Sequence, residues 1–78
     1  MKVYGYEKVD GCDSKLMELS EVTFSASPET LRYIATVINK IADDMESEGK
    51  SFEHAHIQDH CTKWDGMFPD IIISSNAT

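Results

Sequence analysis

The chain has 78 residues, which suffices for one domain but not for two, because smaller units bury too little apolar surface to offset their ordering entropy. We therefore expect a single domain over residues 1–78. Its 14 acidic residues against 7 basic ones give a formal charge of −7, and such a field repels nucleic acid and anionic membrane surfaces. The composition therefore argues against nucleic acid and membranes as partners and favours a basic protein partner.

The two cysteines, Cys12 and Cys61, lie far apart in the sequence and form no C-x-x-C pair. No apolar leader precedes the first charged residues, whereas a secreted domain of this size usually carries a signal segment and several disulfides. We therefore expect reduced thiols and a cytoplasmic location. The longest aliphatic run covers only residues 71–73, far short of the roughly 20 residues of a membrane span.

Two strands are expected before the helix. Residues 3–6 are β-branched and aromatic, and an Asp-Gly turn dipeptide follows at positions 10–11. A second strand is expected over residues 16–25, although its apolar residues move from odd to even positions. A β-bulge near residues 20–21 would return both sets to one face. The alternative is a segment that is buried on both faces.

The sequence predicts an amphipathic helix over residues 28–47. Ser27 can accept a hydrogen bond from a free backbone amide, Pro28 is pre-set for the first turn, and Glu29 suits the positive end of the helix dipole. Gly49 is placed to end the helix. Apolar residues at helical spacing form one stripe, which we expect the core to use fully. The stripe consists of Leu31, Ile34, Ala35, Ile38, Ile41, Ala42 and Met45.

Two more strands are expected after the helix. Residues 52–57 alternate in polarity and place Phe52, His54 and His56 on one face, while a short helix through His56 and His60 is the alternative. Residues 64–69 form a loop, and residues 70–74 form the last strand. The predicted fold class is α+β in β-β-α-β-β order, with one amphipathic helix packed on a small, mostly antiparallel sheet.

The densest polar cluster lies within residues 54–61. Two histidines two positions apart on a strand point the same way, and a carboxylate or thiol could complete a tetrahedral metal site. The spacing matches no zinc signature, so we expect no metal and no other cofactor. The alternative is a small metal-dependent or acid–base enzyme that uses this cluster. Its members are His54, His56, Asp59, His60 and Cys61.

A nucleophile-and-base pair is poorly supported. Cys61 follows His60, but neighbours on an extended chain face opposite ways, and no third residue is marked out to orient the histidine. The sequence also contains no glycine-rich phosphate loop and no G-x-S-x-G elbow. We therefore expect a binding protein and not an enzyme.

A binding surface is expected at the acidic end of the helix and in the segment that follows it. Acidic residues there meet the negative pole of the helix dipole, and a basic partner would relieve this repulsion. The alternative is a solvated helix end. Trp64 and its apolar neighbours are either interface anchors or one end of the core. The predicted partner-binding residues are Asp43, Asp44, Glu46, His54, His56, Asp59, Trp64 and Asp65.

Three blocks in this order resemble the immunity protein 32 family of bacterial polymorphic toxin systems. They are ELSEVTFSASPETL at residues 18–31, FEHAHIQD at 52–59 and PDIII at 69–73. The resemblance implies a non-enzymatic protein, encoded beside a toxin, that protects the producing cell by binding that toxin. A different hypothesis is a self-associating structural protein that forms a homodimer through an edge strand such as residues 70–74.

Overall fold

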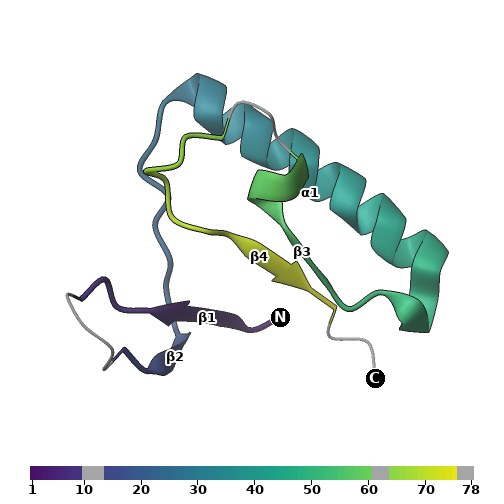
Figure 1. The fold of residues 1–78 in the computed structure, drawn as a ribbon, viewed down its shortest axis with the longest axis horizontal. Coiled ribbons are helices and arrows are strands. Elements are labelled where there is room, and N and C mark those ends of the chain that lie inside the picture. Colours follow the sequence, from purple (N-terminus) through teal and green to yellow (C-terminus); the bar gives the residue numbers. More distant parts are fainter. Residues whose placement is uncertain (10–13, 61–63, 76–78) are drawn as a thin grey trace.

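The computed structural model describes residues 1–9, 14–60 and 64–75 of the 78-residue chain. Figure 1 shows the elements in chain order: β1 (Val3–Tyr6), β2 (Leu16–Leu19), α1 (Pro28–Glu48), the 3₁₀ helix η1 (Gly49–Ser51), β3 (His54–His56), the 3₁₀ helix η2 (Ile57–His60) and β4 (Ile72–Ser74). The α+β class and the β-β-α-β-β order are confirmed. The strands, however, form two separate antiparallel sheets of two strands each.

Helix α1 begins and ends where the sequence predicts. The Ser27 Oγ accepts a hydrogen bond from the Thr30 backbone amide at 3.2 Å, and Pro28 occupies the first turn. Gly49 adopts a positive φ of 57°, and its amide donates to the Met45 carbonyl. The positive φ is a conformation that suits glycine, because a Cβ would make it strained.

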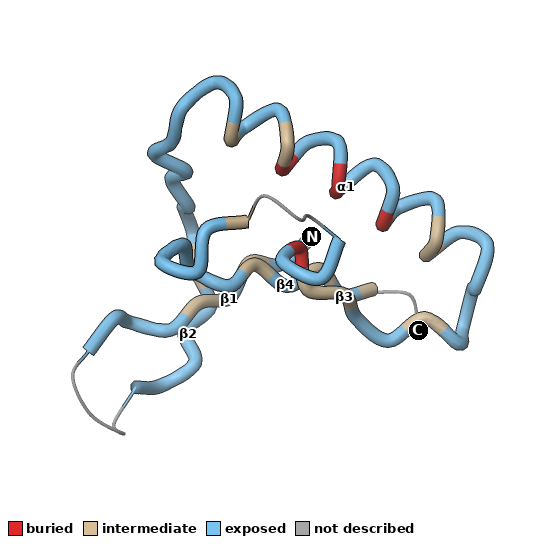
Figure 2. The backbone as a smooth tube through the Cα atoms, turned by 45° about the horizontal axis from the view of Figure 1, so that its top comes forward, coloured by how far each residue is buried: buried red, intermediate tan, exposed pale blue. Residues whose placement is uncertain are grey.

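The face of α1 that meets the core differs from the predicted stripe. Ile34, Val37 and Ile41 are buried, and Val37 was not in the stripe. Leu31 and Ile38 retain 40% and 37% of their exposure. Ala35 and Ala42 are also exposed. The prediction that the core uses the whole stripe is therefore wrong, because the elements under α1 cover only one side of it (Figure 2).

The antiparallel pair of β3 and β4 lies under α1, together with η2. Ala55 pairs with Ile73 in the antiparallel register, and both pack against the core, which includes the fully buried Ile57 of η2. The Ile57 amide donates to the Ile71 carbonyl at 2.9 Å. Both expectations for residues 52–60 are met in part, since a strand ends at His56 and a short helix follows it.

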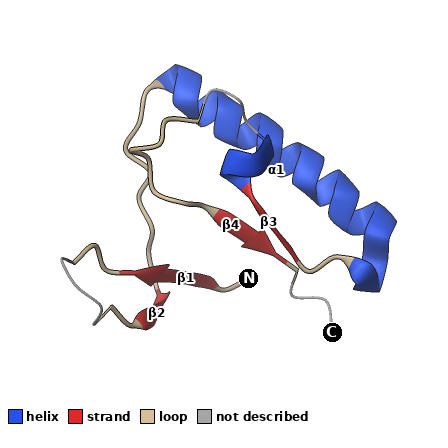
Figure 3. Cartoon of the chain, in the orientation of Figure 1, coloured by secondary structure: helices blue, strands red, loops and turns tan. Residues whose placement is uncertain are grey.

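The N-terminal hairpin of β1 and β2 is the second sheet, and it lies away from α1 (Figure 3). Its register pairs Val3 with Leu19 and Tyr6 with Leu16. The expected second strand is shorter than predicted: it ends at Leu19, and residues 21–27 form no strand. The predicted bulge is therefore wrong, because this segment has no strand partner within the described residues. The expected turn at residues 10–11 lies outside the described residues.

Candidate partner-binding surface

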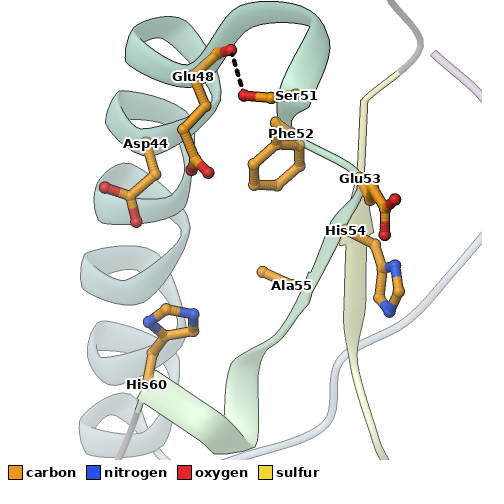
Figure 4. Close-up of a pocket in the computed structure, with 8 residues that line it drawn as sticks. All are labelled: Asp44, Glu48, Ser51, Phe52, Glu53, His54, Ala55 and His60. Atoms are coloured by element: carbon orange, nitrogen blue, oxygen red, sulfur yellow. Dashed lines mark hydrogen bonds between the residues drawn. The ribbon is translucent and has the colours of Figure 1, made fainter.

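A shallow hollow of ≈ 290 Å³ lies where α1 ends and β3 begins. The chain reverses direction at Gly49, so the residues before β3 return alongside the last turns of α1 (Figure 4). Phe52 and Ala55 lie between α1 and β3, and His60 approaches from η2. The lining residues are Asp44, Glu48, Ser51, Phe52, Glu53, His54, Ala55 and His60.

The hollow combines carboxylates with an apolar floor. Phe52 is half-buried and packs against the core, as does Ala55. The carboxylates of Asp44, Glu48 and Glu53 also line the hollow, those of Asp44 and Glu48 from α1 and that of Glu53 from just before β3 (Figure 4). Only the Asp44 carboxylate has a basic partner among the described residues, the Lys40 ammonium at 3.1 Å. An amphipathic cationic side chain such as arginine matches this pairing of apolar surface and negative charge.

The end of α1 carries more acidic than basic side chains. The last turn carries no basic residue, and the Glu48 side chain is exposed. The serines in this region are used internally: the Ser51 Oγ donates to the Glu48 carbonyl at 2.7 Å, and the Ser47 Oγ donates to the Asp44 carbonyl at 3.2 Å. The carbonyl end of the helix dipole and the carboxylates therefore add to one negative potential.

The histidines do not form one cluster. His54 and His56 share a face of β3, and their ring centroids lie 5.2 Å apart in an edge-to-face arrangement. The His56 Nδ1 lies 2.9 Å from the Asp70 Oδ2, so the ring donates a hydrogen bond to that carboxylate. His60 lines the hollow from η2. Phe52 precedes the strand and packs on the core, so it does not share the histidine face as predicted.

Metal coordination needs several donors that converge on one point. Within residues 1–9, 14–60 and 64–75, no three histidine, cysteine, aspartate or glutamate side chains are placed to hold a metal ion. Asp59 is exposed on η2. Cys61, like Cys12, lies outside the described residues.

Trp64 is part of the packing around the core. Its ring packs against the core cluster and meets Phe68 edge-to-face at 5.2 Å. The Asp65 Oδ1 accepts a hydrogen bond from the Met67 amide at 2.8 Å, so Asp65 stabilises the turn of this loop. Of the two alternatives for the aromatic loop, the one in which Trp64 closes an end of the core agrees with this packing. Met67 is 88% exposed.

The structure brings together only part of the predicted binding set. Asp44 and His54 line the hollow, whereas Asp43 and Glu46 are exposed on α1, and His56 and Trp64 lie elsewhere. Ser51, Phe52 and Glu53 are lining residues that the sequence analysis did not select. The signal for them was Gly49, since a helix that ends there must turn its next residues back along itself.

The comparisons with known proteins agree with the resemblance in the sequence. A family model described as Immunity protein 32 matches residues 21–76, well over half of the chain. The matched segment contains α1, β3, η2 and β4 and leaves out the β1–β2 hairpin. No curated protein and no solved structure gave a match. In the part of the chain that is described, α1 and the shorter helices are too polar or too short to span a bilayer.

Proposed function

Because the chain belongs to the immunity protein 32 family, we propose that it binds and neutralises a cognate protein toxin encoded beside it. The family match over residues 21–76 is the observation that carries this proposal. Neutralisation by binding requires a complementary surface and no reaction of the inhibitor's own. The proposal accordingly assigns no catalytic role to His54, His56 or His60.

The toxin surface that fits best is basic. A formal charge of −7 attracts a positively charged partner and raises the rate of encounter. The acidic hollow offers a place for an arginine or lysine of the toxin, since Glu48 and Glu53 form no ion pair within the described residues. We place the centre of the binding surface there. The predicted residues Asp43, Glu46, Asp59 and Asp65 would then lie at its margin or outside it.

Rescue of growth is the direct test of function. The product of the neighbouring reading frame is expressed in cells with and without this chain, and complex formation is measured by calorimetry with purified proteins. We expect cells that express the toxin to grow only when this chain is also present. We also expect a complex that weakens as salt is added, because exposed charges are screened. Toxicity that persists despite soluble protein, together with no detectable complex, would refute the toxin–immunity function.

A pair of double variants tests the surface separately from the function. Asp44→Lys with Glu48→Lys reverses charge in the hollow, and Glu18→Lys with Glu21→Lys makes the same charge change on exposed residues outside it. The first variant should bind the toxin more weakly, because a basic partner then meets positive charge in the hollow. The second should bind nearly as tightly as the natural chain. Equal binding by both variants would move the surface elsewhere.

A further inference from the structure

Helix α1 presents a second apolar stripe, which its own core does not cover. We call Leu31, Ala35, Ile38 and Ala42 the outer seam. All four residues are exposed, although each is apolar and lies within one helix. The inner seam of Ile34, Val37 and Ile41 lies beside it and is buried.

The spacing of the outer seam is that of a helix–helix contact. Its residues are separated by four, three and four positions, the alternation that keeps side chains on the line along which two helices pack. Large and small residues also alternate, since Leu31 and Ile38 are each followed by an alanine four positions later. Alanine allows close approach of a second helix, and a larger side chain fills the space beside it.

A second copy of α1 in antiparallel orientation satisfies this pattern. A two-fold axis between residues 36 and 37 places Leu31 opposite Ala42 of the second copy, and Ala35 opposite Ile38 of the second copy. Every layer then joins a large side chain to a small one, and the two-fold symmetry makes the surface complementary to itself. A parallel pairing in register would instead set leucine against leucine and alanine against alanine.

The charges beside the seam agree with the same orientation. Arg32 and Asp43 are exposed and lie about three turns apart, so they occupy one flank of the helix. In the antiparallel pair, Arg32 of one chain lies close to Asp43 of the other, and the contact occurs twice by symmetry. Within the chain itself, neither side chain forms an ion pair among the described residues.

We propose that two copies of this chain associate through the outer seam of α1, antiparallel and with the two-fold axis between residues 36 and 37. This surface is distinct from the acidic hollow and from the edge of β4, and the proposal does not depend on toxin binding. Four residues over three turns cover less than the roughly 800 Å² per partner of a standard stable interface. The dimer is therefore weak and depends on protein concentration. Salt strengthens it by screening the repulsion between two chains of charge −7.

Sedimentation equilibrium of the full chain at several protein and salt concentrations tests the proposal. We expect a monomer–dimer equilibrium that shifts toward dimer as salt is added, opposite to the expected weakening of the toxin complex. Ala35→Glu should abolish the dimer. Thr23→Glu is the control, because it adds the same charge to an exposed position outside α1. A natural chain that is monomeric throughout, or a dimer that Ala35→Glu leaves intact, would overturn the proposal.

A charge exchange tests the register without altering the apolar residues. Arg32→Asp should weaken the dimer at low salt by more than Asp43→Arg, because Asp43→Arg also lowers the repulsion between the two chains. The double variant should restore the dimer, because the ion pair is rebuilt with its signs reversed. Circular dichroism checks that each variant keeps its helix. A double variant as weak as the worse single variant would exclude the antiparallel register.

Discussion

The two halves of the molecule are stabilised by different kinds of interaction. α1 with β3, η2 and β4 contains the four buried hydrophobic side chains Ile34, Val37, Ile41 and Ile57. The β1–β2 hairpin has a complete four-pair ladder, but none of its described side chains, at residues 1–9 and 14–19, belongs to that core. Its Tyr6 and Leu16 are 66% and 57% exposed. One half is stabilised by burial and the other mainly by its backbone hydrogen bonds.

This difference indicates where the folding unit lies. A two-stranded hairpin alone is marginally stable in water, whereas a helix packed on strands can support a core. The family model begins at residue 21, after the hairpin has ended. We therefore expect α1, β3, η2 and β4 to unfold together and the hairpin to open on its own at lower free energy.

The largest effect is expected from Ile41→Ala. Ile41 is 0% exposed at the centre of the core, so the substitution removes buried methyl groups and leaves a cavity. The free energy of unfolding in urea should fall by about 2–5 kcal/mol. Ile72→Ala is the control, because Ile72 is 53% exposed and its site can fill with water. Equal losses in the two variants would mean that the core does not centre on α1.

Gly49→Ala should have the next largest effect. Gly49 has a φ of 57°, and a Cβ there would meet nothing within 4 Å, so the cost is backbone strain without a clash. We expect a loss of about 1–2 kcal/mol in unfolding free energy. Gly66→Ala provides the control, because a Cβ there also meets nothing within 4 Å and its φ is not in the left-handed region.

Ser27→Ala should cost about 1 kcal/mol through loss of the helix cap. The Ser27 Oγ accepts from the Thr30 amide, and the alanine variant leaves that amide to water. Ser25→Ala changes a nearby exposed serine before the helix and should leave stability unchanged within error. Thermal unfolding followed by circular dichroism compares the two. A smaller loss for Ser27→Ala than for Ser25→Ala would contradict the role of the cap.

The smallest effect is expected from Leu19→Ala in the hairpin. Leu19 is half-buried against its own sheet, where it lies over Gly5. The free energy of global unfolding should change by less than about 0.5 kcal/mol, because the hairpin opens before the core and Leu19 does not contact the core cluster of the described residues. Hydrogen exchange should show faster exchange of the β1 and β2 amides with unchanged exchange in α1. Faster exchange in α1 as well, in parallel with the hairpin, would mean that the two halves unfold together.

The local features of the fold were predictable from the sequence because nearby residues determine them. Ser27, Pro28 and Gly49 act through the backbone within one turn, and they defined the limits of α1. The face of α1 that meets the core was not predictable, since it depends on how much of the apolar stripe the rest of the chain can cover. Val37 is buried and Ile38 is not, although isoleucine is the more apolar of the two.

The same reasoning explains why the second strand was predicted to be longer than it is. Val22 and Phe24 have the alternation of a strand, but alternation predicts a strand only where a partner strand is present. The acidic end of α1 was visible in the sequence as a run of carboxylates. The approach of His60 to that end could not be predicted, because it depends on the chain reversal at Gly49 and on the path of β3 and η2.

Because Trp64 packs on the core, its fluorescence can report the unfolding of α1, β3, η2 and β4. The sequence contains one tryptophan, so all indole emission arises at this point. Its ring packs on the core and its Nε1 is buried, with no hydrogen-bond partner among the described residues. The emission should therefore lie to the blue in the folded chain and move to the red when the core opens. Because the β1–β2 hairpin contains no tryptophan, the emission should not change when the hairpin alone opens.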